Sequence, residues 1–227
     1  MTRWKLAWRR GLRSVGWFIP MLGAAMIFGA ILTTAGTTQI SFLRLNTLEI
    51  VMPLIVGVQA AMLFAPDDEP PLELILTKPR PIQWVLYERL AALILIYGLI
   101  GATGSLLVTL LPDPEPLRLT LLRWLPPTIC MIGVGLWVSA SARRVSQGVF
   151  IAVMLCAAMA VGQSVFLPKY DFMAWVMFYV QPWDVSPERY LANRIIVALI
   201  GFVAFTLTLL RLRDAENLLG TNQAVTP

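Results

Sequence analysis

The chain contains no histidine among its 227 residues. Histidine is the commonest side chain for proton transfer near neutral pH and the commonest metal ligand. Its absence excludes Ser-His-Asp catalysis and histidine-ligated zinc or haem sites within this sequence. Cysteine is almost as scarce, because only Cys130 and Cys156 occur, both inside apolar runs. We expect these two thiols to lie at different depths, too far apart for a disulfide, and to serve as packing residues.

Charged residues are also few, at 14% of the chain, whereas hydrophobic residues make up 58%. Soluble domains carry about 25% charged residues, and a fold of this size cannot hide so much apolar surface in one core. The expected solvent is therefore a lipid bilayer. The net charge of +5 does not indicate a nucleic-acid partner, because the basic residues cluster beside apolar runs, where they fix membrane orientation.

Six apolar runs follow one another, each close to the ~20 residues that cross a bilayer as a helix. The sequence therefore predicts an all-α membrane protein with one transmembrane domain over residues 1–227. The predicted spans are 17–35, 48–65, 90–111, 125–142, 148–167 and 190–210. Residues 1–16 combine arginines with tryptophans at helical spacing, which predicts an interfacial helix. The run after it is too long for a signal peptide, and we expect it to remain as the first span.

Lysine and arginine are distributed unequally between the two predicted sides of the membrane. With a cytoplasmic N-terminus, the inner segments hold twelve of them: Arg3, Lys5, Arg9, Arg10, Arg13, Lys78, Arg80, Arg89, Arg143, Arg144, Arg211 and Arg213. The outer segments hold six: Arg44, Arg118, Arg123, Lys169, Arg189 and Arg194. This excess predicts a cell (inner or plasma) membrane protein with both termini cytoplasmic.

The loop between the second and third predicted spans, residues 66–82, has the features of a short helix. Pro70 and Pro71 fit a first helical turn, the acidic residues before them suit the helix dipole, and Pro79 ends the helix. Leu72, Ile75 and Leu76 would form one apolar stripe, with Glu73 and Thr77 beside it. Such a helix on the cytoplasmic face can fill the groove of a soluble partner. An ordinary interfacial helix that contacts only lipid and neighbouring spans is the alternative.

The segment 168–189 is apolar but broken by prolines and charges, and it contains Trp175, Tyr179, Pro182 and Trp183. Irregular backbone at membrane depth requires protein or water around it. An aromatic-rich interfacial loop explains the composition equally well.

Four polar residues inside the spans are candidates for lining a substrate path, namely Gln59, Ser105, Thr109 and Gln163. Hydrogen bonds between helices are the more common use of such residues. Glu49 is expected at the outer interface, and no ionisable side chain is expected near mid-membrane. Ion-coupled transport normally needs one, so the sequence favours transport driven by ATP.

Residues 68–79 resemble the coupling segment of ABC transporter permeases of the type 2 exporter class. The family pattern is roughly acid-x-Gly-Thr-x-Glu-x-Leu-Leu-x-x-Pro between spans two and three. Asp68 and Glu73 match its two acids, Ile75 and Leu76 its paired leucines, and Pro79 its proline. The chain departs from the pattern at residues 70–71, where Pro-Pro replaces Gly-Thr. The outer segment also resembles this class, whose re-entrant hairpin often reads Pro-x-Trp and then Tyr-x-x-Pro.

The resemblance implies a permease subunit that forms the translocation path as a dimer, with a second copy or a homologous permease. Two separate ABC ATPase subunits would bind ATP and magnesium, and this chain would bind no cofactor and no metal. The sequence agrees, since it contains no G-x-x-x-x-G-K-[ST] phosphate loop. The implied coupling residues are Asp68, Glu69, Leu72, Glu73, Ile75, Leu76, Thr77, Lys78 and Pro79.

Other functions remain open at this point. A non-transporting membrane anchor or assembly subunit would use the same cytoplasmic helix to recruit a partner. A membrane-embedded enzyme is the third possibility, although the sequence shows no nucleophile with a neighbouring base. A haem-exporter-type permease is a narrower form of the first reading, which the missing histidines neither require nor exclude.

Overall fold

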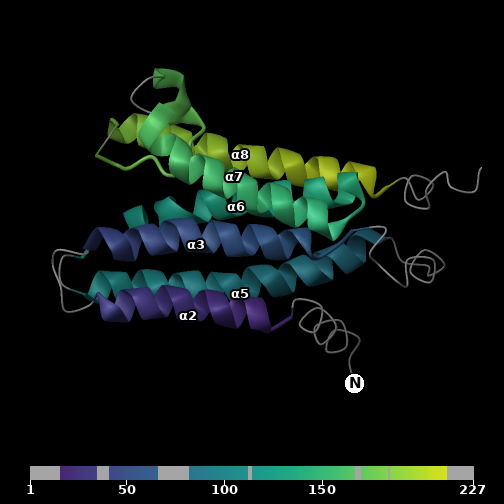
Figure 1. Ribbon diagram of the computed structural model, residues 1–227, viewed down its shortest axis with the longest axis horizontal. Coiled ribbons are helices and arrows are strands. Elements are labelled where there is room, and N and C mark those ends of the chain that lie inside the picture. Colours follow the sequence, from purple (N-terminus) through teal and green to yellow (C-terminus); the bar gives the residue numbers. More distant parts are fainter. Residues whose placement is uncertain are drawn as a thin grey trace, which may run out of the picture.

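The computed structural model describes residues 16–34, 41–65, 82–111, 114–166, 170–183 and 185–213. Within these ranges, six α-helices run roughly along the long axis of the molecule, and one short 3-10 helix lies between the last two of them (Figure 1). The α-helices are α2 (Phe18–Thr33), α3 (Ser41–Ala61), α5 (Ile82–Leu110), α6 (Leu117–Ala142), α7 (Val145–Phe166) and α8 (Pro187–Arg211). The 3-10 helix η3 covers Asp171–Trp175. The prediction of an all-α protein is confirmed for the described part of the chain.

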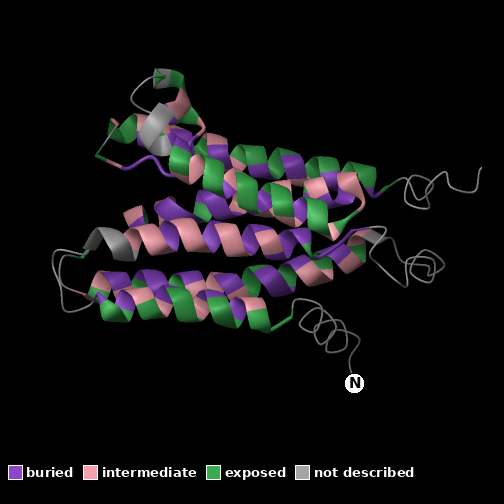
Figure 2. Cartoon of the chain, viewed as in Figure 1, coloured by how far each residue is buried: buried purple, intermediate pink, exposed green. Residues whose placement is uncertain are grey.

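Four of these helices, α5, α6, α7 and α8, are long and apolar enough to cross a membrane, while α2 and the Leu45–Ala61 part of α3 are apolar but shorter. Exposed positions recur along the outside of the bundle (Figure 2). Many of them are large hydrophobic residues, for example Phe18, Leu99, Leu110 and Val161. Apolar residues on both the inside and the outside of a helix bundle are typical of a protein surrounded by lipid. The fold is that of a membrane-embedded protein.

Each predicted span corresponds to one helix, but several helices begin earlier than predicted. Helix α3 begins at Ser41 instead of 48, α5 at Ile82 instead of 90, and α6 at Leu117 instead of 125. The stretches 41–46 and 82–89 were therefore wrongly assigned to loops. Their polar residues concealed helical turns, because polar groups are tolerated in a membrane bundle where they face other helices.

Helices α3 and α6 form the centre of the bundle. Helix α6 packs most closely on α8 and α3, α7 packs on α3 and α6, and α2 packs on α3. Glycines permit the close contacts: a Cβ on Gly135 would lie 2.6 Å from the carbonyl oxygen of Gly57, and one on Gly201 would lie 2.6 Å from the Cα of Cys130. Small residues at crossings are the usual means by which membrane helices approach one another.

Local sequence signals set two of the helix ends. Ser186 caps α8, because its hydroxyl oxygen accepts a hydrogen bond from the backbone N–H of Arg189 (3.4 Å), and Pro187 occupies the first turn. Helix α6 ends at Arg143, which adopts a left-handed conformation with φ 64°. Helix α7 then begins only two residues later. Cys130 on α6 and Cys156 on α7 lie at similar distances from this tight turn, so they are at similar depth in the bundle. Both thiols are free and buried in one hydrophobic cluster, so they are packing residues, but the expected difference in depth was wrong.

Candidate functional site

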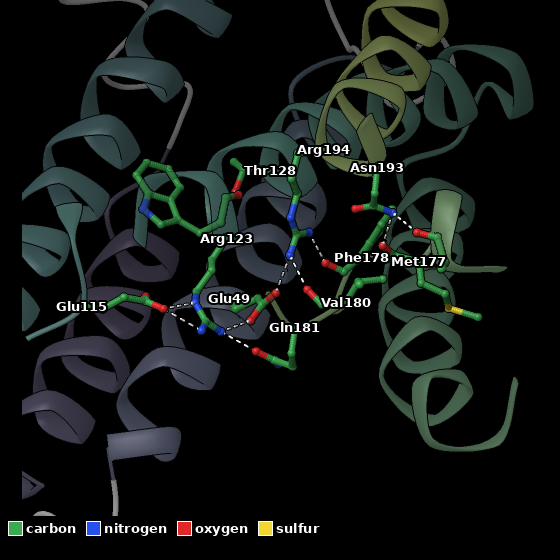
Figure 3. A network of polar contacts seen from close by, with 12 residues as sticks. Glu49, Glu115, Arg123, Thr128, Met177, Phe178, Val180, Gln181, Asn193 and Arg194 are labelled. Atoms are coloured by element: carbon green, nitrogen blue, oxygen red, sulfur yellow. Dashed lines mark hydrogen bonds and ion pairs between the residues drawn. The ribbon is translucent and has the colours of Figure 1, made fainter. Parts of the chain in front are cut away.

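Glu49, on α3, lies at the centre of a network of buried charges (Figure 3). Its two carboxylate oxygens accept hydrogen bonds from two arginines: Arg194 Nη2 donates to Oε1 at 2.9 Å, and Arg123 Nη1 donates to Oε2 at 3.3 Å. The side chains of Glu49 and Arg194 are each 1% exposed. The two arginines come from α8 and α6, so this one carboxylate joins three helices.

The other donors of the Arg123 guanidinium bind two residues that lie outside the α-helices, Glu115 and Gln181. Its Nε and Nη2 both donate to Oε1 of Glu115, at 2.9 and 2.7 Å, and its Nη1 also donates to Oε1 of Gln181 at 2.5 Å. The ring of Trp183 lies over the same guanidinium, 5.1 Å from its carbon to the ring centroid. These contacts, with the bond to Glu49, make four hydrogen bonds around one planar guanidinium, a geometry that a lysine cannot reproduce.

Arg194 and its neighbour Asn193 hold the irregular segment between η3 and α8. Arg194 donates to the backbone carbonyls of Phe178 and, at 3.0 Å, Val180. Asn193 Nδ2 donates to the carbonyls of Ala174 (2.9 Å) and Met177 (3.0 Å). These carbonyls lie outside the α-helices, and a buried carbonyl without a hydrogen-bond partner costs free energy. Side chains of α8 therefore supply hydrogen bonds that the backbone of 174–180 does not make within an α-helix.

The segment that these side chains hold is itself largely buried. Met177, Phe178, Tyr179, Val180 and Gln181 all have little exposure. Burial raises the pKa of the Tyr179 hydroxyl, which keeps it neutral. At the outer edge of the segment, the exposed Trp183 stacks on Arg123, and Arg189 lies over the ring of Trp175 at 5.6 Å. The segment therefore presents aromatic side chains outward while its backbone is fixed inward.

The network balances its charges, with two carboxylates, Glu49 and Glu115, against two guanidiniums, Arg123 and Arg194. Such balance is necessary, because a buried charge left without its partner costs about 3–5 kcal/mol. No nucleophile with an adjacent base is part of it, and no group of three His, Cys, Asp or Glu residues comes together within the described ranges. The arrangement holds α3, α6, α8 and the 174–181 segment to one another. We call the residues that form it, Glu49, Glu115, Arg123, Gln181, Asn193 and Arg194, the clamp.

The sequence interpretation missed this network. Glu49 was expected at the membrane interface, and Arg123 and Arg194 were counted as charges of outer segments, whereas all three are buried inside the bundle. The positions of these three residues in the sequence did indicate that they could pair. Each of the three residues falls within or beside an apolar run, towards the end that was predicted to be outer, so one carboxylate and two guanidiniums were available at a similar depth to pair.

Three of the four predicted path-lining residues are already hydrogen-bonded. Gln59 Oε1 accepts from the hydroxyl of Tyr97, and its Nε2 donates to the carbonyl of Gly16 at 3.3 Å. Ser105 accepts from the indole N–H of Trp124 at 2.9 Å and donates to the carbonyl of Gly101. Thr109 donates to the carbonyl of Leu106 in its own helix. The Gln59 and Ser105 contacts join different helices, which is the alternative use considered for them.

The remaining predicted site residues are distributed as follows. Gln163 belongs to α7, but its side chain is not described. The whole predicted coupling set, Asp68 to Pro79, lies outside the described residues, and so does most of the predicted interfacial helix 1–16. The outer segment is described at 170–183 and from 185 onward. It contains the 3-10 helix η3, and a re-entrant path remains a prediction.

Taken together, the helices and the clamp define an all-helical, membrane-embedded protein whose irregular segment between α7 and α8 is held by buried side chains. No family model, no curated protein and no solved structure matches the chain.

Proposed function

We propose that the chain is the membrane-spanning permease subunit of an ATP-driven ABC exporter. In this proposal it crosses the membrane six times, dimerises with a second copy or a homologous permease, and is driven by separate ATPase subunits that carry ATP and magnesium. The main support is the sequence of the 66–82 segment, with Glu73, the Ile75–Leu76 pair and Pro79 spaced as in the coupling segment of that class.

The arrangement of the helices is consistent with this role. The end of α3 and the start of α5, which flank residues 66–81, lie at the opposite end of the bundle from η3 (Figure 1). A coupling segment on the cytoplasmic side would therefore be separated from the clamped outer segment by the full length of the helices. Helix α3 connects the two regions along the chain, because it ends at Ala61, shortly before residues 66–82, and carries Glu49 of the clamp in its first half.

The mechanism follows from that arrangement. Closure of two ATPase subunits on ATP would displace the coupling segment, and with it the adjoining ends of α3 and α5. ATP binding would then bias a two-state bundle whose states differ in affinity for the substrate. The clamp would keep the outer segment attached to α3, α6 and α8 during that change, so that it moves with these helices as one unit.

A charge reversal tests the coupling role. The double variant Glu73→Arg, Leu76→Arg is expressed beside its candidate ATPase, and both co-purification and ATP-dependent transport are measured. The matched control is Glu188→Arg, Leu117→Arg, which makes the same two changes at exposed positions at the other end of the bundle. We expect the first variant to lose ATPase binding and transport, and the control to keep the binding.

Three results would contradict the proposal. If the Glu73→Arg, Leu76→Arg variant still binds its ATPase and transports, the coupling assignment is wrong. If the native chain binds a cytoplasmic partner through this segment but supports no ATP-dependent transport, it is an anchor or assembly subunit. If the purified chain alone shows turnover of a substrate, it is a membrane-embedded enzyme.

A further inference from the structure

An apolar pocket of about 360 Å³ lies halfway along the bundle. It is lined by α3, α5, α6 and α8, and its walls include Val56, Leu93, Tyr97, Trp124 and Gly201. The lining residues of α5, α6 and α8 lie at least six residues from either end of their helices. At this depth the surroundings of a membrane-embedded protein are the hydrocarbon tails of lipids.

The pocket has a buried floor and an exposed mouth. Val56, Leu93, Tyr97 and Trp124 are buried. On the opposite side, Ile94 of α5, Leu125 of α6 and Phe202 of α8 are 52%, 42% and 56% exposed. The pocket therefore opens sideways between α5 and α8, onto the face of the bundle that lipid would contact.

Both ends of the pocket along the helix axes are closed. At one end α5 and α8 meet, because Gln83 Nε2 donates to the carbonyl of Leu209 at 3.1 Å and the rings of Tyr87 and Phe205 pack edge-on at 6.4 Å. At the other end the indole of Trp124 fills the space over Gly101, where a Cβ would lie 2.5 Å from it. The result is a slot with one lateral opening.

The polar groups of the wall are already hydrogen-bonded within the protein. The Tyr97 hydroxyl donates to Gln59, Trp124 Nε1 donates to Ser105 at 2.9 Å, and Thr128 Oγ1 donates to the carbonyl of Trp124 at 2.6 Å. These three donors are therefore already used, and a polar ligand would lose its hydrogen bonds to water on entry and regain few, which is unfavourable. The wall therefore selects a ligand portion that is pure hydrocarbon.

We propose that this pocket is a binding site for one acyl chain of a membrane lipid, inserted from the side between α5 and α8. A helix of a second copy, about 10–12 Å across, is too thick to enter a slot of this volume that is closed at both ends. An extended acyl chain is thin, apolar along its length and abundant at this depth. The proposal depends only on the chain being embedded in a membrane, and not on the transport function proposed above.

Gly98 offers a direct test, because it lines the pocket and a Cβ built on it meets no atom within 4 Å. A side chain at this position therefore has open space at its Cβ and can extend into the pocket. The test series is Gly98→Ala, Gly98→Leu and Gly98→Phe. The matched control is Gly29→Phe on α2, a helical glycine whose Cβ would also meet no atom within 4 Å.

The full chain is reconstituted in phosphatidylcholine nanodiscs with a phosphatidylcholine that carries a photoactivatable diazirine midway along one acyl chain. Labelled residues are then mapped by mass spectrometry. We expect labelling around Ile94, Leu125 and Phe202 to exceed that of Leu22 and Met26, which are exposed on α2. Gly98→Phe is expected to lower pocket labelling about tenfold, equivalent to about 1.4 kcal/mol of binding, and Gly98→Ala much less. Gly29→Phe should leave it unchanged.

Equal labelling of the pocket and of the α2 residues would show ordinary lipid contact and overturn the proposal. Pocket labelling that is unaffected by Gly98→Phe would overturn it as well. Folding of this variant is checked by size-exclusion chromatography, where it should elute as a single species, and by a melting temperature equal to that of Gly29→Phe. Crosslinks from the mouth residues to a second copy, in place of lipid, would show that another chain covers the pocket, which also contradicts it.

Discussion

Arg194 on α8 forms a 2.9 Å ion pair with Glu49 on α3, across 145 positions of sequence. The pair is fully buried, and the same Arg194 also binds the backbone carbonyls of Phe178 and Val180. One side chain thus connects the first half of the bundle, its last helix and the irregular segment before that helix. Buried charges are kept only where both partners are present, so the stability of this region depends on the pair as a unit.

Removing the central carboxylate should be strongly destabilising. In Glu49→Gln, Arg123 and Arg194 keep their positive charges but lose the carboxylate between them. We expect a loss of about 3–5 kcal/mol in the free energy of unfolding, measured by denaturant or thermal unfolding in detergent micelles. Glu115→Gln should cost less, because the side chain of Glu115 is 12% exposed and its partner Arg123 keeps Glu49. Glu188→Gln, at an exposed position, should be neutral, and equal effects of all three changes would contradict the network.

The hydrogen bonds of Asn193 should control local order in the 174–177 region. Asn193→Leu keeps a similar volume but removes the two donated hydrogen bonds to Ala174 and Met177. We expect faster amide hydrogen exchange across 174–181, because local opening then costs less free energy, with little change in α5. The control is Leu191→Asn on the same helix, at an exposed position. Unchanged exchange in the segment would show that α8 does not hold it.

Close packing of α6 against α8 should make one glycine intolerant of side chains. In Gly201→Leu the new Cβ would lie within 2.6 Å of the Cα of Cys130, so the helices must separate. We expect a loss of at least about 1–3 kcal/mol in stability from overpacking, with aggregation during purification as its visible sign. Gly29→Leu, which meets no neighbouring atom, provides the comparison. A Gly201→Leu protein as stable as this control would contradict the packing.

Both native thiols should be inert towards maleimide in the folded protein. Cys130 and Cys156 are 1% and 3% exposed, so reagent can reach them only after opening of the bundle. Intact-mass measurement should show no addition in mild detergent and two additions after denaturation. Rapid labelling of either thiol in the folded state would contradict the packing of α6 and α7.

An added cysteine in the 66–81 segment can then report on its side of the membrane in intact cells, without removing the native ones.

The helices were predictable from the sequence because their cause is local. A run of about 20 apolar residues forms a helix in lipid whatever its neighbours are, and each of the six runs corresponds to one helix. The helix starts were less predictable. Glu88 and Arg123 lie in polar stretches that we predicted to be loops, whereas the structure places them near the starts of α5 and α6.

The clamp could not be predicted because its cause is tertiary. Nothing near Glu49 in the sequence indicates that Arg194 will lie beside it, and each residue alone is more simply explained at the membrane surface. The acceptors of Arg194 and Asn193 are backbone carbonyls, which leave no trace in the amino-acid pattern. The same holds for the slot beside Gly98, which exists only because Trp124 and Phe205 close its ends.

The glycine at position 201 has a mechanical consequence for α6 and α8. At this crossing the two helical backbones touch without side chains between them. No interdigitated side chains therefore resist a small rotation of one helix relative to the other at this point, although the backbones cannot come closer. The crossing near Gly133 and Gly201 lies about halfway along both helices, so a swivel between them would be centred there. Arg194 lies on one side of this crossing, and its ion pair with Glu49 opposes such a swivel, because tilting α8 here would draw the guanidinium away from the carboxylate.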